Sequence, residues 1–266
     1  MLVHSLVAQN DAAESENKIH EDSVARQYGF AGGLVPGVTV YAYLTWPAVE
    51  RWGLEWLDRG AMSARFASPV YDGETVEIHS HERDGVLHVE ARNPKGEVCA
   101  TATASLPDDP VEPFPAADFP TIALPAPETR PPASEDTLRS VPLGVVERRW
   151  HAAKATHYLD LVSDDLSVYR DPPVAHPGWL LRAANAVLSQ SVRLGPWIHV
   201  SSDCQYHGRV ADGDVVTTKA RVTDVFERKG HRFVAMDVLM AVAERPVLSV
   251  RHTAIYEPRT RDVNQD

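Results

Sequence analysis

The chain has 266 residues, of which 44% are hydrophobic and 24% charged, which is typical of a globular protein with one large domain or two ordinary ones. Its net charge of −11 argues against a nucleic-acid partner, because the phosphates of a nucleic acid would be repelled. No apolar run approaches the length of a membrane span, so no membrane partner is expected.

The N-terminus and the cysteines both bear on the compartment. Residues 1–11 show neither the basic n-region nor the apolar core of a signal peptide. Cys99 and Cys204 fall in strand-like apolar runs, where buried free thiols are expected. We therefore expect a cytoplasmic protein.

The first predicted element is a short helix, here called the flap, between Glu21 and Gly29. Acidic residues at Glu21 and Asp22 favour a helix N-terminus, and Gly29 and the pair Gly32-Gly33 end the helix. His20 lies in the loop just before the flap.

A buried helix and three strands follow the flap. Pro36-Gly37 opens an apolar segment, 38–46, with the density of a helix buried on most sides. Period-two alternation then predicts antiparallel strands, which are separated by turn signals. These strands are 75–81, 86–92 and 97–105.

A proline-rich stretch separates this first half from the rest of the chain. Residues 107–136 hold nine of the 20 prolines, which excludes a helix or an inner strand and predicts an extended surface linker. The sequence thus predicts a first domain of residues 1–106, a linker of 107–136 and a second domain of 137–266.

The second half repeats the first. Pro177-Gly178 opens a second apolar segment, 179–188, and residues 66–76 align with 206–216 without a gap. Three further strands are predicted at 215–226, 232–242 and 247–256. Each half therefore has one buried helix and about four antiparallel strands, which predicts an α+β fold with a sheet wrapped round a central helix, made twice.

The two copies differ at His20. Tyr169 stands at its place in the second half, and only seven residues separate Tyr169 from Pro177, so the flap is missing there. A solvent-exposed histidine on a polar loop is the alternative interpretation of His20. Its loss together with the flap favours a functional site in the first half and a supporting role for the second.

These segments resemble a known family. Asn17-Lys-Ile-His20, the flap, Leu34-Val-Pro-Gly37 and residues 66–73 together resemble the MaoC-like, (R)-specific enoyl-CoA hydratases, which have the hot-dog fold. The resemblance covers most of both halves and so implies a tandem, or double, hot-dog. It also implies a hydro-lyase that adds or removes water at an acyl thioester, with acyl-CoA as the expected substrate.

The resemblance assigns roles to individual residues. His20 matches the catalytic histidine, Asn17 its supporting asparagine and Gly37 the oxyanion-hole glycine, with Pro36 and Val38 beside it as substrate-binding positions. The chemistry is suited to these groups, because a helix N-terminus offers free N–H groups and a histidine with a pKa near ~6.5 exchanges protons near neutral pH. No metal or other cofactor is expected.

One position departs from the family pattern, Asp-x-Asn-Pro-Ile/Val-His. Ser15 replaces the aspartate that holds the water with the histidine, and Lys18 replaces the proline. Glu16 is the candidate to replace the missing carboxylate, with a solvated loop acid as the alternative.

The second copy lacks the complete pair. Asp164 stands at the family's aspartate position, but its partner is Tyr169, so this half-site is expected to be inactive. His176, just before Pro177, is expected to serve packing or hydrogen bonding.

Other readings of the chain remain open. His79 and His81 share one strand face, but no third ligand stands at a matching spacing, so no metal site is expected. A hot-dog thioesterase and a non-catalytic acyl-thioester or small-ligand binder are the alternatives to the hydratase. A homodimer of the fused pair is expected, because hot-dog proteins cover sheet edges and helix faces by pairing.

Overall fold

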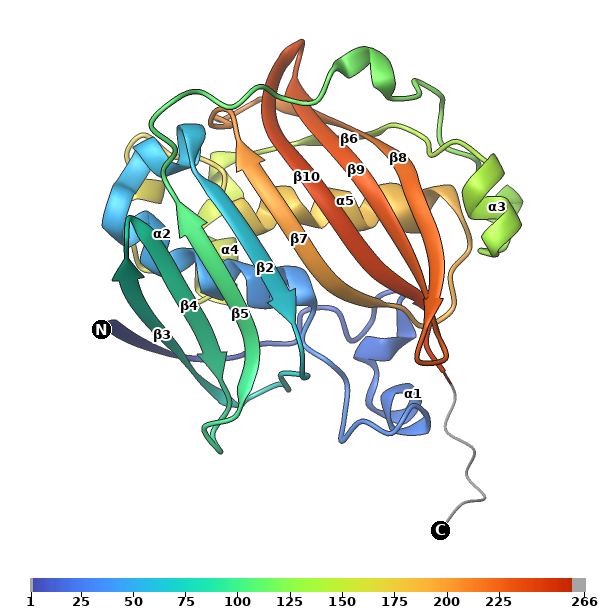
Figure 1. Ribbon diagram of the computed structural model, residues 1–266, viewed down its shortest axis with the longest axis horizontal. Coiled ribbons are helices and arrows are strands. Elements are labelled where there is room, and N and C mark those ends of the chain that lie inside the picture. Colours follow the sequence, from blue (N-terminus) through green and yellow to red (C-terminus); the bar gives the residue numbers. More distant parts are fainter. Residues whose placement is uncertain (1, 260–266) are drawn as a thin grey trace.

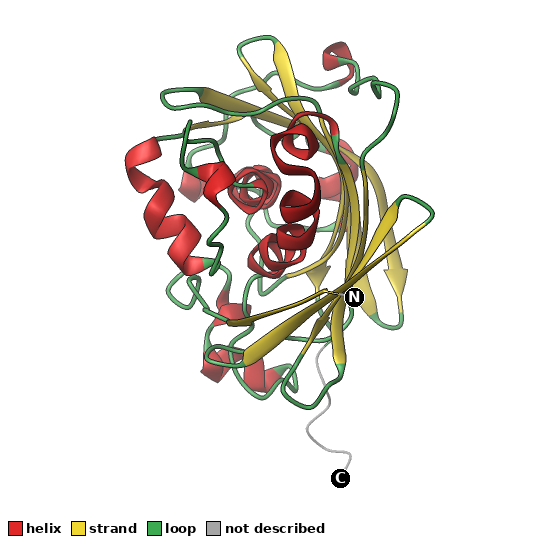
Figure 2. Cartoon of the chain, turned by 90° about the vertical axis from the view of Figure 1, so that its left-hand side faces the viewer, coloured by secondary structure: helices red, strands yellow, loops and turns green. Residues whose placement is uncertain are grey.

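The computed structural model describes residues 2–259, which form one antiparallel sheet around two long helices. The sheet has ten strands in the order β1-β3-β4-β5-β2-β7-β10-β9-β8-β6. The helices α2 (Gly37–Arg59) and α5 (Pro177–Ser191) lie on one side of the curved sheet (Figures 1 and 2). This arrangement confirms the predicted α+β fold with a sheet wrapped round central helices.

The first half contributes five strands and the flap. Its strands are β1 (Leu2–Val7), β2 (Ala61–Phe66), β3 (Thr75–Arg83), β4 (Val86–Arg92) and β5 (Val98–Ser105). Its short helices are η1 (Lys18–His20) and α1 (Asp22–Gln27), the helix of the flap. The prediction missed β1 and β2, because β1 is a largely exposed edge strand and β2 begins directly after the helix cap Gly60.

The second half repeats this plan with another five strands. They are β6 (Val146–Arg149), β7 (Ile198–Tyr206), β8 (Val215–Arg228), β9 (His231–Val242) and β10 (Arg245–Glu257). Its short helices are η4 (Ala152–Lys154), α4 (Ala155–Leu161) and η5 (Ser167–Tyr169). Because η5 ends at Tyr169 as η1 ends at His20, the two turns correspond in structure as well as in sequence.

The two halves share one sheet and one core. Strand β2 pairs antiparallel with β7, from Ala61 opposite Gln205 to Arg65 opposite Ser201. Beneath this pairing, α2 packs against α5, and the hydroxyl groups of Tyr41 and Tyr206 are hydrogen-bonded at 2.7 Å. The apolar faces of both halves are therefore buried against each other and not only against their own helices.

The proline-rich stretch runs extended past one end of the second half's strands (Figure 1). It contains the single turns η2 (Ala116–Asp118) and η3 (Pro127–Thr129) and leads into α3 (Glu135–Ser140), which Ser134 caps. Contacts such as Lys219 Nζ to Thr121 Oγ1, at 2.7 Å, fix it to the sheet. No helix in residues 2–259 combines the length and the apolar character needed to cross a bilayer.

Candidate functional site

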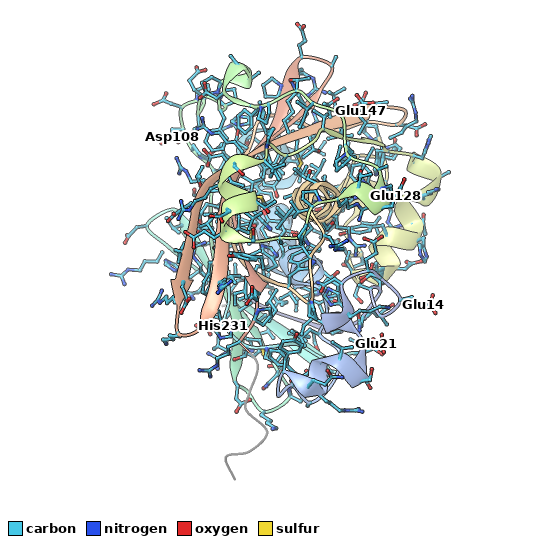
Figure 3. All side chains as sticks on the ribbon, turned by 90° about the vertical axis from the view of Figure 1, so that its right-hand side faces the viewer. Glu14, Glu21, Asp108, Glu128, Glu147 and His231 are labelled. Atoms are coloured by element: carbon cyan, nitrogen blue, oxygen red, sulfur yellow. The ribbon has the colours of Figure 1, made fainter. Side chains whose placement is uncertain are left out.

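A pocket of about 660 Å³ lies where the two halves meet. Residues of η1, the flap region and the start of α2 line it from the first half. Residues of α5, β7, β10 and the β8–β9 hairpin line it from the second. In Figure 3, which shows the molecule from its right-hand side, His231 of the hairpin lies at about the same height as Glu14 and Glu21. Two copies of one ancestral half therefore build a single site.

His20 lies at the end of η1 and lines this pocket. Its Nδ1 is 2.7 Å from the carbonyl oxygen of Leu34, and its Nε2 is 3.2 Å from Nδ2 of Asn17. A turn of 3-10 helix brings Asn17 and His20 onto the same side, because residues three apart eclipse each other in this helix.

The hydrogen bonds of Asn17 determine the tautomer of His20. Trp197 donates its N–H to Oδ1 of Asn17 at 3.1 Å and accepts from Nδ2 at 2.9 Å, which fixes the orientation of the amide. The second hydrogen on Nδ2 then points to Nε2 of His20, which must accept it. The proton of the neutral ring is consequently on Nδ1, where the carbonyl oxygen of Leu34 accepts it. Nε2 is left as the basic nitrogen.

Burial keeps His20 in this neutral form. Desolvation lowers the pKa of His20 below its ordinary value, against smaller opposing effects of the Leu34 carbonyl and the Asp11 carboxylate, while Arg182 lowers it further. At neutral pH the ring is therefore uncharged and able to take a proton.

Helix α2 begins at the wall of the pocket, beside Pro36 and Gly37. The amide of Val35 donates to Val70 at 2.9 Å, which ties the helix start to the neighbouring loop. The amides of Thr39 and Val40 donate to the carbonyl oxygen of Pro36. As the first residues of the helix, Gly37 and Val38 have no partner within it for their amides. The side chain of Val38 is buried and does not line the pocket.

A close contact explains the glycine at position 37. A Cβ placed on Gly37 would lie 2.8 Å from Nδ1 of His199, on β7 of the second half. Real Cβ atoms do not approach other atoms so closely, so only glycine allows the imidazole of His199 to reach the start of α2.

The structure removes Glu16 from the site. Its side chain is 79% exposed, and its carboxylate pairs with Arg130 at 2.9 Å and not with His20. Glu16 does not line the pocket, because Asn17 is buried against Trp197 and the preceding side chain points the other way. Ser15 donates to the carbonyl oxygen of Asn17 at 3.3 Å and is likewise absent from the walls.

No aspartate or glutamate is among the described residues that line the pocket. The acid that acts on His20 is Asp11, whose carboxylate pairs with Arg182 at 2.6 Å outside the pocket walls. The chain therefore surrounds its pocket with neutral and basic side chains, although the whole protein has a net charge of −11.

The second half brings polar groups that the sequence did not indicate. Ser202 lies between two buried histidines, with its hydroxyl 2.9 Å from Nε2 of His199 and 2.9 Å from Nδ1 of His252. Nδ1 of His199 has no hydrogen-bond partner among the described residues, and neither has Oδ1 of Asn185, which also lines the pocket. Strand β7 was not predicted, so nothing placed His199 on a buried face.

Burial also controls the charge of these two histidines. Desolvation lowers the pKa of His199 well below its ordinary value, and the nearby His252 lowers it further. Desolvation lowers the pKa of His252 to about 4. Both rings are therefore neutral at physiological pH, and each can donate one hydrogen bond and accept one.

At the start of α5, the second-half counterpart of the start of α2, a side chain occupies the free amide. His176 caps α5, where its Nδ1 accepts the amide hydrogen of Gly178 at 3.0 Å, and its Nε2 lies 3.1 Å from Asp164. The ring of Tyr169 packs on His176 with centroids 4.8 Å apart. The amide of Gly178 is thus already hydrogen-bonded, whereas that of Gly37 is free. His176 therefore has the packing and hydrogen-bonding role that was expected.

The remaining candidate residues have ordinary surroundings. His79 pairs with Glu77 at 2.8 Å, and the ring of His81 stacks on that of His88. Residues 2–259 contain no group of three or more side chains suited to holding a metal ion.

Two helices enclosed by one continuous antiparallel sheet, with a site at their junction, define a double hot-dog protein. A protein from Chloroflexus aurantiacus described as a MaoC domain dehydratase has a TM-score of 0.61 and 13% identity, over 97% of this chain and 95% of its own. A Mycobacterium tuberculosis protein with a double hot-dog fold has a TM-score of 0.62 and 14% identity, over 96% and 95%.

A third structure is the dehydratase domain of PpsC from Mycobacterium tuberculosis in complex with C12:1-CoA, with a TM-score of 0.55 and 14% identity, over 95% of this chain and 92% of its own. No protein-family model and no curated protein matches the sequence. The chain has the double hot-dog fold of the MaoC-like dehydratases. Because the identities are only 13–14%, the structural likeness establishes the fold alone, and the reaction has to be argued from the residues of the site.

Proposed function

We propose that the protein is a hydratase or dehydratase that interconverts a 3-hydroxyacyl thioester with an enoyl thioester and water. The observation that carries this proposal is the neutral His20, with a basic Nε2, in the same pocket as the free helix start at Gly37. The bound C12:1-CoA of the PpsC dehydratase domain supports acyl-CoA as the substrate class.

The reaction needs a base and a site for developing negative charge. In the dehydrating direction, Nε2 of His20 takes the proton from Cα, and the electron pair moves onto the thioester oxygen. The first amide of α2, at Gly37, together with the positive end of the helix, stabilises this enolate. When the enolate collapses, the C–O bond at Cβ breaks, and His20 returns its proton to the leaving oxygen as water forms.

The second half contributes a hydrogen-bond donor of its own to the site. In the tautomer in which Ser202 donates to Nε2 of His199, the hydrogen of His199 is on Nδ1, beside Gly37. We assign this N–H as a further donor to the thioester oxygen. A neutral imidazole is suited to this role, because it donates without bringing a charge into the apolar pocket.

The absence of a carboxylate from the pocket lining of residues 2–259 favours a second candidate, a protein that binds acyl thioesters without turnover. It argues against a thioesterase that depends on a carboxylate in the pocket, although a protein from Thermobifida fusca described as a thioesterase II has a TM-score of 0.50 with 16% identity, over 86% of this chain and 89% of its own.

A panel of enoyl-CoA substrates of increasing chain length, followed at the enone absorbance, tests these candidates. We expect hydration by the wild type and its loss in His20→Ala. Release of free CoA would support a thioesterase instead, and tight binding without turnover would support the binding protein.

His79→Ala is the matched control, because His79 is a first-half histidine on a strand away from the pocket and should leave the rate unchanged. An unchanged rate in His20→Ala would refute the assignment of the site. The cytoplasmic location and the homodimer stay predictions, and light scattering of the purified protein tests the dimer.

A further inference from the structure

The hairpin between β8 and β9 carries an unbalanced positive charge at the pocket. Arg228 and Lys229 form its turn with Gly230, and both are among the lining residues. Figure 1 shows that the hairpin ends beside α1, the helix of the flap, at one end of the molecule. The positive side chains therefore lie at the exposed edge of the site, while His199 and Gly37 lie inside it.

No carboxylate of residues 2–259 forms an ion pair with Arg228 or Lys229. Arg232, on the far side of the turn, pairs with Glu257 at 3.3 Å. None of the ion pairs among residues 2–259 includes Arg228 or Lys229. The chain has 37 acidic residues, but among the described residues that line the pocket Arg228 and Lys229 are the only ones of the Asp, Glu, Lys and Arg types.

The duplication supplies an internal comparison. In the first half, Arg83, Asp84 and Gly85 form the equivalent turn between β3 and β4, with nearly the same backbone: φ is 53° at Asp84 and 54° at Lys229. There Arg83 pairs with Asp84 at 3.4 Å, so the turn has no net charge, and it does not line the pocket. The backbone of the turn is common to both halves, whereas the charge is specific to the one at the pocket.

A row of apolar side chains joins the basic turn to the reactive end. Ile198, Ile255 and Phe233 are cross-strand partners on β7, β10 and β9, and all three line the pocket. Three neighbouring strands span ~10 Å, so the row provides an uncharged stretch of about that length along the pocket wall. A ligand that fits has a reactive thioester, an uncharged arm and a phosphate at the far end.

We infer that Arg228 and Lys229 bind the phosphate groups of a phosphopantetheine thioester whose arm lies along Ile198, Ile255 and Phe233. This inference rests on the proposed function for the thioester end and adds the recognition of its carrier. The same chemistry occurs in coenzyme A, which has further phosphates on its nucleotide, and in a carrier protein, which presents 4′-phosphopantetheine alone.

Calorimetric titration of the full chain with pantetheine, 4′-phosphopantetheine and coenzyme A tests the inference. We expect coenzyme A to bind about tenfold more tightly than pantetheine, with an advantage that falls as salt is added, because charge-assisted hydrogen bonds are screened. Reversing both charges, in R228E/K229E, should remove that advantage and leave the affinity for pantetheine unchanged.

R83E is the matched control, since it reverses a charge in the equivalent turn of the first half and should retain the advantage of coenzyme A. A full gain with 4′-phosphopantetheine assigns the contact to the phosphate next to the arm, and a gain that needs coenzyme A assigns it to the nucleotide phosphates.

Equal affinity for coenzyme A and pantetheine, or an equal loss in R83E and R228E/K229E, would overturn the inference. These ligands carry no acyl group, so their binding is independent of any turnover, and the hydratase assignment can fail without affecting this result.

Discussion

His176 accepts a hydrogen bond from the amide of Gly178 at 3.0 Å, whereas the amide of Gly37, which lines the pocket, has no hydrogen-bond partner among the described residues. Both residues follow a proline at the start of a central helix, so they occupy equivalent positions in the two halves. In the second half the cap uses up the donor that an oxyanion would need. One side chain therefore explains why a duplicated fold has one candidate site and not two.

Gly37→Ala should disturb the free helix start directly. Its methyl group would meet His199 at 2.8 Å, so the ring or the helix must shift, at a cost of about 1–3 kcal/mol in the free energy of unfolding. We expect lower hydration activity and a lower denaturant midpoint. Gly195→Ala is the control, because nothing lies within 4 Å of a Cβ there. Equal midpoints for the two variants would contradict the contact.

Asn17→Ala should affect both stability and catalysis. It removes the two hydrogen bonds to Trp197 and leaves the buried backbone groups of that residue unpaired, which costs about 1–3 kcal/mol. It also removes the amide that positions the imidazole of His20, so kcat should fall. Chemical denaturation and steady-state kinetics measure the two effects. Retention of both wild-type values would show that the interaction is dispensable.

His199→Gln tests the assigned donor to the thioester oxygen. Loss of a donor to the developing charge lowers kcat by about 10²-fold, with a smaller effect on KM, because the bond strengthens in the transition state. Ser202→Ala, which leaves the ring in place but removes the hydroxyl between the two histidines, should have a milder effect in the same direction. A normal kcat in a folded His199→Gln protein would exclude the role.

Acid should destabilise the protein through His252. The pKa of His252 is lowered from 6.5 to about 4 in the folded state, so between these values the unfolded chain binds the proton more strongly. The free energy of unfolding therefore falls as the pH drops below 6.5 and is constant, for this group, above it. The expected loss is on the order of 2 kcal/mol between pH 7 and pH 5.

Urea denaturation at the two pH values measures this loss. His252→Gln should show a shallower dependence on pH than the wild type, although His20 and His199 still contribute, because burial lowers their pKa values in the same direction. An identical slope in the variant would assign the acid sensitivity to other groups.

Local patterns in the sequence were sufficient for much of the fold. The helix starts at Pro36-Gly37 and Pro177-Gly178, the flap and six strands follow from periodicity and turn chemistry, which depend on neighbours in the chain. The edge strands β1 and β6 and the junction strands β2 and β7 were missed, because pairing between distant segments leaves a weak local signal.

The site could be located from the sequence but not completed. His20 and Gly37 lie in sequence motifs, and both line the pocket. Glu16, the candidate beside the family's aspartate position at Ser15, pairs with Arg130 instead. His199 and Asn185 come from a strand and a helix of the other half, and only the paired sheet brings them to the pocket.

The hydrogen bonds between Asn17 and Trp197 join residues that are 180 positions apart. Closing so long a loop has a high entropic cost, so contacts of this kind form late, after local helices and hairpins. The pocket should consequently be among the last features to assemble when the chain folds. A ribosome that has made only the first half has produced His20 and Gly37 but not yet the pocket, so a ligand that fills the pocket would report that both halves have folded.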